Sequence, residues 1–244
     1  MPLKKREEWL IRMKTVSRDT VKKAFTATIP VMTGYVVLAI GFGILLKTKG
    51  YGVGWAIAMS VFIYAGSMQY LAIDLLSGGA ALITTAITTL MVNARHLFYG
   101  ISMVERYKDT GKKKPYLIFA LTDETYSLVC SEESVKGVKE PKEYYLLVSL
   151  FNQAYWVIGS IIGSLLGNII PFNVEGIDFA LTALFVTIFV EQWLTMKNHK
   201  PALIGVIASV ACLLIFGPDS FLIPAMIIIV TLLIALRSLK GEFT

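Results

Sequence analysis

Charged residues are scarce in this chain of 244 amino acids: they make up 16% of the sequence, against roughly 25% in an average soluble domain. Hydrophobic residues make up 55%, and the mean hydropathy is +0.66. The buried core of a soluble protein of this length could not hold so much apolar surface, so the excess must face lipid. The composition therefore predicts an integral membrane protein.

Cysteine is almost absent, and the familiar catalytic motifs are missing. Cys130 and Cys212 lie far apart in apolar surroundings, with no C-x-x-C motif and no histidine nearby. This excludes a disulfide framework and a zinc motif, and predicts two small buried hydrophobes. There is no G-x-S-x-G motif, no clear catalytic triad and no duplicated aspartate string of the membrane aspartyl protease type. We predict no metal, no cofactor and no enzymatic activity.

Positive charge is concentrated in residues 1–23, which contain eight basic and three acidic side chains. No basic face continues beyond this arm, which argues against a nucleic-acid partner. A basic segment ahead of the first apolar segment marks the cytoplasmic side and suits anionic lipid headgroups, although a merely solvated arm is the plainer alternative. The arm is too long and too charged for an ordinary signal peptide. We predict a retained cytoplasmic arm at 1–23 and a single transmembrane transport domain at 24–240, multi-pass in the inner (plasma) membrane.

Eight apolar segments carry most of the remaining sequence. They lie at about 29–46, 53–76, 79–103, 115–131, 144–170, 176–195, 201–216 and 220–237. A membrane-spanning helix needs about 20 apolar residues, so the first, fourth and seventh segments are short. We predict an all-α polytopic membrane protein of about 6–8 hydrophobic helices, some of them short, broken or re-entrant.

Glycine and proline interrupt the first apolar segment. Short, glycine-interrupted segments are typical of discontinuous helices in transporters, while tight helix packing at small residues is the alternative. We expect the helix to break at Pro30, Gly41 and Gly43.

A weak internal repeat and the loop charges bear on topology. Phe62 precedes Gln69 by seven residues, as Phe185 precedes Gln192. These matches favour repeat halves at about 29–103 and 144–216, linked by 104–143. With the amino terminus inside, three full crossings would place the basic residues of 106–114 outside, against the positive-inside tendency. One of the first three segments and 115–131 are therefore predicted to re-enter.

Three polar strings lie within or near these apolar segments: Tyr64–Gln69, Asn93–His96 and Thr122–Tyr126. Polar groups at membrane depth usually face a bundle interior or an aqueous cavity and indicate a transport path. Residues 122–127 cover the whole circumference of a helix, so we expect this segment to line a cavity or to break. A helix lying flat on the cytoplasmic surface is the alternative.

Helical spacing sorts the second string. Asn93 and His96 share one face, whereas Arg95 points with Tyr99, so Asn93 and His96 are favoured over Arg95 as site residues. Arg95 has an alternative role, snorkelling toward the end of its segment near Met103, and His96 alone would more often be a packed histidine. In the first string, an unwound turn at Gly66–Ser67 would expose amides able to bind a carboxylate.

In this order the three strings resemble the AzlC family of bacterial inner-membrane permeases. The resemblance runs over about residues 20–238, and its specific motifs lie in the first half. They are Phe62-x-Tyr64-Ala65-Gly66-Ser67-x-Gln69-Tyr70, Asn93-x-Arg95-His96-Leu97-x-Tyr99 and Thr122-Asp123-Glu124-x-Tyr126, with Pro30, Gly34, Gly41 and Gly43 ahead of them. The family implies export of branched-chain amino acids, valine above all, resistance to the leucine analogue azaleucine, and a small hydrophobic AzlD-type partner.

The resemblance also implies roles for the strings. The expected substrate-binding residues are Tyr64, Gly66, Ser67, Gln69, Asn93, Arg95, His96, Thr122, Asp123, Glu124 and Tyr126. Asp123 or Glu124 would bind the ammonium group of an amino acid, and Arg95 or freed backbone amides its carboxylate. Phe62, Tyr64 and Tyr126 would form an apolar wall. His96 with Asp123 or Glu124 would bind a driving proton. A transporter or channel for another small metabolite is the alternative function.

Overall fold

The computed structural model describes residues 16–131, 133–167, 198–218 and 221–239, with scattered positions between 179 and 194. All regular secondary structure within these residues is helical, which confirms the predicted all-α class. The chain forms two compact units, Met1–Ala180 and Leu181–Thr244. Each unit is described by itself.

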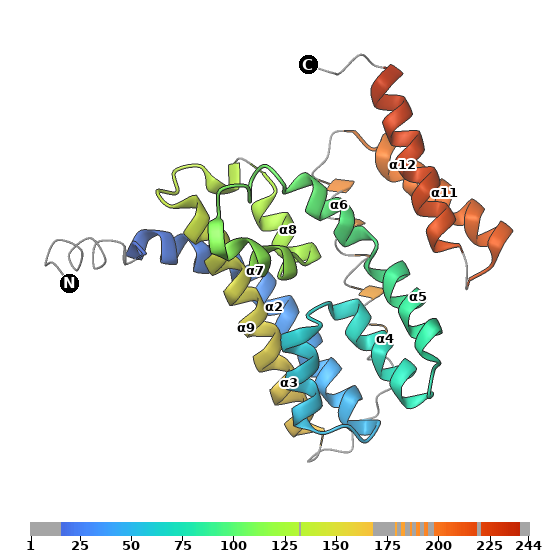
Figure 1. Cartoon of the computed structure of the whole chain (residues 1–244), viewed down its shortest axis with the longest axis horizontal. Coiled ribbons are helices and arrows are strands. Elements are labelled where there is room, and N and C mark those ends of the chain that lie inside the picture. Colours follow the sequence, from blue (N-terminus) through green and yellow to red (C-terminus); the bar gives the residue numbers. More distant parts are fainter. Residues whose placement is uncertain are drawn as a thin grey trace, which may run out of the picture. The chain divides into compact units, whose positions relative to one another are not determined.

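Two long helices lie side by side in the first unit: α2 (Arg18–Thr48) and α9 (Pro141–Leu166) (Figure 1). They are the two helices in the described part of the chain that are long and apolar enough to cross a membrane. Ser17 caps α2, because its hydroxyl accepts a hydrogen bond from the Thr20 amide at 3.2 Å. Pro141 occupies the first turn of α9, where a missing N–H costs nothing.

The helix breaks predicted at Pro30, Gly41 and Gly43 are wrong, because α2 continues through all three residues. Pro30 is tolerated inside the helix, as prolines often are in membrane helices. Gly43 has a packing role instead: a Cβ atom there would overlap the backbone of Ser160 and Ser164 on α9. The small residue therefore permits close approach of two helices.

Glycines of α9 contribute to the same close contact between the two long helices, which we call the α2–α9 seam. A Cβ atom on Gly159 would lie 2.7 Å from the Cβ of Ala39, and one on Gly163 would overlap the Ile40 carbonyl. Tight packing at small residues, the alternative considered from the sequence, is thus correct for Gly43, Gly159 and Gly163.

Each of the next three apolar segments is split into two short helices. They are α3 (Val53–Phe62) and α4 (Gly66–Ser77), α5 (Leu82–Asn93) and α6 (Arg95–Ser102), and α7 (Lys114–Phe119) and α8 (Asp123–Val129). The interruptions lie at Ile63–Ala65, Ala94 and Ala120–Thr122. The segment expected to break or to line a cavity is therefore broken, but ahead of most of its polar residues, because Asp123–Val129 is helical. No single flat helix covers 115–131.

A buried cluster fixes the turn between α6 and α7 against the start of α9. Its centre is formed by Tyr107, Leu117 and Val148, each at most 1% exposed. The turn includes the 3-10 helix Gly111–Lys113, whose Lys113 pairs with Glu143 of α9. A second 3-10 helix, Glu133–Val135, lies between α8 and α9. These contacts place α8 next to both long helices.

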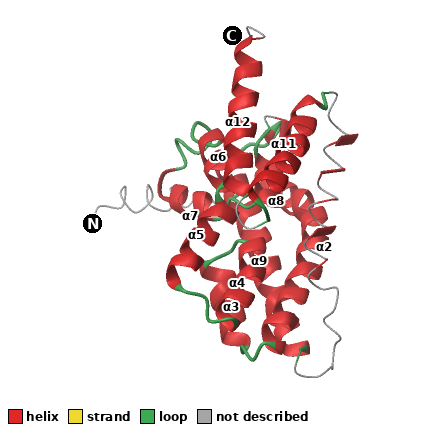
Figure 2. Ribbon diagram, turned by 90° about the vertical axis from the view of Figure 1, so that its right-hand side faces the viewer, coloured by secondary structure: helices red, strands yellow, loops and turns green. Residues whose placement is uncertain are grey.

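The second unit contains two apolar helices in contact, α11 (Lys200–Phe216) and α12 (Leu222–Leu239) (Figure 2). Most of the segment predicted at 176–195, including Phe185 and Gln192, lies outside the described residues. So does the arm before residue 16. The internal repeat and the fate of the arm stay predictions.

Candidate functional site

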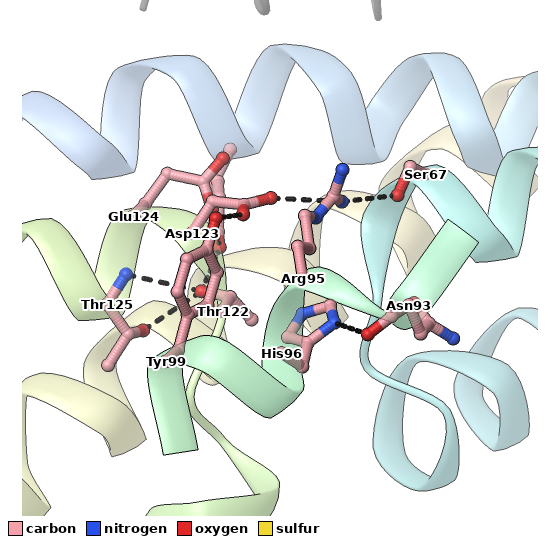
Figure 3. Close-up of polar contacts among 10 residues, drawn as sticks. Ser67, Asn93, Arg95, His96, Tyr99, Thr122, Asp123, Glu124 and Thr125 are labelled. Atoms are coloured by element: carbon pink, nitrogen blue, oxygen red, sulfur yellow. Dashed lines mark hydrogen bonds and ion pairs between the residues drawn. The ribbon is translucent and has the colours of Figure 1, made fainter. Parts of the chain in front are cut away.

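The three helix interruptions meet at one side chain, Arg95 (Figure 3). Its Nη2 donates to the Ser67 hydroxyl at 2.6 Å and lies 3.0 Å from Asp123 Oδ2. One guanidinium therefore links the first turns of α4, α6 and α8, and each of the three polar strings supplies one member of the contact.

The first string forms an uncapped helix start. Tyr64 takes a left-handed backbone conformation with φ of 44°, and Ala65 precedes α4 without offering a capping side chain. The first intrahelical bond of α4 is donated by the Gln69 amide to the Ala65 carbonyl, at 2.8 Å. As in any α-helix, the amides ahead of it, including those of Gly66 and Ser67, have no acceptor within the helix. The unwound turn considered at Gly66–Ser67 lies just ahead of these residues, at Ile63–Ala65, and Gly66 and Ser67 form the first turn of α4.

The third string forms a capped helix start. The Thr122 hydroxyl accepts from the Thr125 amide at 3.2 Å, so Thr122 is the N-cap of α8. Asp123 and Glu124 follow in the first turn, where carboxylates interact favourably with the helix dipole. The polarity of this string is what ends α7 and begins a new helix.

Asp123 has a partner on each oxygen. Arg95 approaches Oδ2, and the Tyr99 hydroxyl donates to Oδ1 at 2.5 Å. Arg95 and Tyr99 are four residues apart on α6, so they share a face as the spacing predicts. The side chains of Arg95 and Asp123 are 28% and 18% exposed. Arg95 does not snorkel toward Met103, and that alternative is wrong.

A second network surrounds Glu124. The Tyr35 hydroxyl donates to Glu124 Oε2 at 2.6 Å and lies 2.7 Å from Thr122 Oγ1. Thr122 donates to Thr125 Oγ1 at 3.1 Å, and the Asn152 amide donates to the same Thr125 oxygen at 3.0 Å. Side chains of α2, α8 and α9 thus form a continuous polar chain that ends on a carboxylate.

The remaining residues of the first string are buried. Gln69 is fully buried, and its amide donates to Ser60 Oγ at 3.3 Å. Tyr64 is 3% exposed and packs against Phe119, with 6.2 Å between ring centroids. Phe62 is 77% exposed, so it does not share a wall with Tyr64, and that part of the prediction is wrong.

Tyr126 contributes an aromatic surface beside the ion pair. Its ring stacks on that of Tyr99 with centroids 4.6 Å apart, and its hydroxyl accepts from Ser102 at 3.1 Å. The stack lies directly next to the carboxylate that Tyr99 binds.

Asn93 and His96 lie at the edge of this arrangement. His96 Nδ1 is 3.2 Å from the backbone oxygen of Asn93, and the imidazole packs edge-on against Tyr99. Within the described residues, no hydrogen bond or ion pair joins His96 to Asp123 or Glu124. Arg95 therefore lies at the centre of the arrangement and Asn93 and His96 at its edge, while the preference for Asn93 and His96 as substrate-binding residues stays a prediction.

The sequence reasoning missed two residues from the long helices. Tyr35 of α2 binds Glu124, and Trp156 of α9 packs its ring 5.2 Å from that of Tyr35. A Cβ atom on Gly66 would lie 3.0 Å from Trp156 Cη2, so the indole covers the start of α4. Neither residue belongs to a motif, and each shares its apolar segment with other hydrogen-bonding side chains, such as Thr33 and Asn152, so the sequence did not single them out. In the part of the chain that the structure describes, no group of three His, Cys, Asp or Glu side chains is arranged to hold a metal ion.

Comparison with known proteins supports a single family. The family described as AzlC protein matches residues 30–170. The branched-chain amino acid transport protein AzlC of Bacillus subtilis (strain 168) is 44% identical over 216 residues, which cover 88% of this chain and 85% of that protein. An uncharacterized membrane protein of Helicobacter pylori is 42% identical over 88% of this chain and 94% of that protein. The inner membrane protein YgaZ of Escherichia coli (strain K12) is 24% identical over 82% of each chain. No solved structure matches the chain.

Proposed function

The chain belongs to the AzlC family, and on that premise we propose that it is an inner-membrane permease that exports branched-chain amino acids. The substrates would be valine, leucine and isoleucine, together with analogues such as azaleucine. The structural observation that supports this function is the meeting of Ser67, Arg95 and Asp123 at the starts of three short helices.

The ion pair offers complementary charges to a zwitterion. Arg95 and Asp123 neutralise each other at 3.0 Å, which lowers the cost of holding two charges within a membrane protein. A bound amino acid would replace each partner: its ammonium group binds Asp123, and its carboxylate binds Arg95 and the amides of Gly66 and Ser67. Substrate binding would thereby release the contact between α4, α6 and α8, so we assign the pair a gating role.

Export against a gradient requires a driving ion. We propose that a proton supplies it, carried by the titratable groups beside the pair, with His96 working alongside Asp123 or Glu124. The chain of Tyr35, Thr122 and Thr125 beside Glu124 provides hydroxyl groups that can pass a proton.

Valine efflux from loaded cells tests this function. We expect saturable efflux that collapses with an uncoupler, and at least a tenfold loss in Asp123→Asn, because the charge that balances Arg95 is removed. The matched control is Glu105→Gln, since Glu105 is 81% exposed and pairs with Lys108 on the surface. Unchanged efflux in Asp123→Asn would reject the carboxylate role. Passive, unsaturable flux would instead favour the channel alternative.

Two further parts of the proposal concern the assembly. We propose that a small, very hydrophobic AzlD-type subunit acts with this chain, so efflux should depend on its co-expression. We also propose that the amino terminus and the loop around Lys112 face the cytoplasm, following the positive-inside tendency. Ready labelling of a cysteine at position 112 from outside intact cells would contradict that orientation.

A further inference from the structure

A buried polar stripe runs along α9. Ser149, Asn152, Trp156 and Ser160 recur at spacings of three or four residues, so they lie on one face of the helix. Each is at most 3% exposed. From Ser149 to Ser160 the stripe extends about 16 Å along the helix axis, roughly half the thickness of a bilayer core.

The stripe passes both interrupted segments that flank it. Asn152 binds Thr125 of α8 at 3.0 Å, and Ser160 accepts from Ser60 of α3 at 2.9 Å. Between them, Trp156 packs against Gly66 at the start of α4. One face of a continuous helix therefore touches the short helices that surround the proposed substrate site.

Several polar atoms on and beside this stripe are buried without a hydrogen-bond partner among the described residues. They are Ser149 Oγ, Asn152 Oδ1, Trp156 Nε1 and, on α4, Gln69 Oε1. Ser160 is a contrast, because its hydroxyl donates to the Trp156 carbonyl at 2.8 Å as well as accepting from Ser60. Ser160 fits a structural role between helices. The other groups do not, since buried polar atoms in a membrane protein are normally satisfied.

The chemical types of these atoms match an α-amino acid. Asn152 and Gln69 offer amide oxygens, which accept hydrogen bonds, and Trp156 offers an N–H donor. A zwitterionic amino acid carries the complementary set, an ammonium donor and a carboxylate acceptor. Beside them, Tyr35 and Phe42 pack against the Trp156 ring and supply apolar surface for a branched side chain.

We propose that this face of α9 is the fixed wall of the transport path, with Asn152 and Trp156 as its substrate-binding residues. Asn152 and Gln69 accept hydrogen bonds from the ammonium group, and Trp156 donates to the carboxylate, as the substrate passes the Arg95–Asp123 pair. The choice of an amino acid as the passing molecule rests on the proposed function. The existence of a path along α9 does not, so the two can fail separately.

Thiol labelling tests the path. In a chain carrying Cys130→Ala and Cys212→Ala, a permeant thiol reagent should modify Asn152→Cys at least tenfold faster than Ile158→Cys. Ile158 lies on the opposite face of α9 and is 53% exposed, so it serves as the lipid-facing control. Equal rates would overturn the proposal. Protection of Asn152→Cys by valine supports both the path and its substrate, whereas fast labelling that no branched-chain amino acid slows supports the path and rejects the amino-acid assignment.

A conservative substitution tests the Trp156 donor. Trp156→Phe keeps an aromatic ring beside Tyr35 but removes the N–H group, together with the outer ring of the indole that packs against Gly66. We expect KM for valine to rise by a factor between about 2 and 10, the usual range for one uncharged hydrogen bond, with an unchanged maximal rate. The melting temperature should fall, because the smaller side chain leaves a cavity at a buried position. The matched control is Trp55→Phe, because Trp55 is 50% exposed on α3. An unchanged KM in Trp156→Phe would overturn the donor role.

Discussion

The α2–α9 seam and the interrupted segments differ in how their helices are built, although both belong to the same unit. Along the seam, Gly43, Gly159 and Gly163 allow two continuous helices to approach within backbone contact. In the interrupted segments, helices of six to twelve residues end and restart around polar side chains.

The comparison shows which signal marks a break in this chain. Pro30, Gly41 and Gly43 lie inside an unbroken helix, whereas the breaks fall at Ile63–Ala65, Ala94 and Ala120–Thr122. A glycine in an apolar helix is compatible with close packing, and a proline is tolerated there. The polar strings lie beside the breaks: Gly66–Gln69 and Asp123–Tyr126 start the helices that follow one. The polar strings, and not the glycines, therefore predict where the breaks lie.

The largest effect is expected from a substitution in the seam. In Gly163→Val, the new Cβ overlaps the Ile40 carbonyl and forces α2 and α9 apart, so we expect about 3 kcal/mol of destabilisation or loss of folded protein. The melting temperature and yield in detergent measure it. The control is Gly34→Val, because no atom lies within 4 Å of a Cβ atom on Gly34. Equal melting of the two variants would show that the seam does not hold the helices together.

The next effect concerns the meeting point of the short helices. Arg95→Lys keeps the charge but replaces the planar guanidinium, whose Nη2 contacts both Ser67 and Asp123, by a shorter ammonium side chain, so we expect valine efflux to fall about tenfold. Arg106→Lys is the control, since Arg106 donates to the Ser131 carbonyl at 3.3 Å in an exposed turn. Full efflux in Arg95→Lys would mean that charge alone suffices and that the geometry is unimportant.

A smaller effect is expected where a long helix touches the site. Tyr35→Phe leaves Glu124 without its donor, and we expect a loss of about 1.5 kcal/mol of stability with a several-fold loss of efflux. Thermal unfolding and efflux are measured on the same preparation. Tyr51→Phe removes a hydroxyl from a tyrosine outside the site and should change neither value. Unaltered stability and efflux in Tyr35→Phe would show that the hydrogen bond from Tyr35 of α2 to Glu124 does not contribute to the site.

The smallest effect is expected at Asp74, a carboxylate that lies within an apolar segment, as Asp123 does, but outside the site. Asp74 lies on the stripe of Ser67 by helical spacing, yet it is 69% exposed and only 3.9 Å from Lys49 on the surface. Asp74→Asn should therefore change stability by less than about 0.5 kcal/mol and leave valine efflux intact. A clear loss of efflux would show that the site extends to the far end of α4 and that Asp74 belongs to it.

The fold class and the neighbourhood of one break could be predicted from the sequence. Hydropathy alone requires lipid contact, and the polar residues at 122–127 cannot all be hidden from lipid by rotating a helix. The family motifs also bring together the strings that supply Ser67, Arg95 and Asp123. These features depend on local composition, which the sequence displays directly.

The partners of individual side chains could not be predicted. Helical spacing does not distinguish an Arg95 side chain that snorkels from one that binds Asp123. The position of α8 decides between the two. Gly43 is equally compatible with a break and a close contact until α9 is placed against it. Asn152 and Trp156 belong to no distinctive motif. Their contacts are made with α8 and α4, which are distant in sequence, so the residues around them give no indication of a role.

Tyr64 gives the first break a mechanical consequence. A left-handed backbone, with φ of 44°, is unfavourable for a residue with a Cβ atom by roughly 1–2 kcal/mol. The turn between α3 and α4 is therefore conformationally strained, and a return of Tyr64 to a right-handed conformation would relieve that strain. Because this turn leads directly into α4, a movement of α4 that relieved the strain at Tyr64 would also move the amides of Gly66 and Ser67.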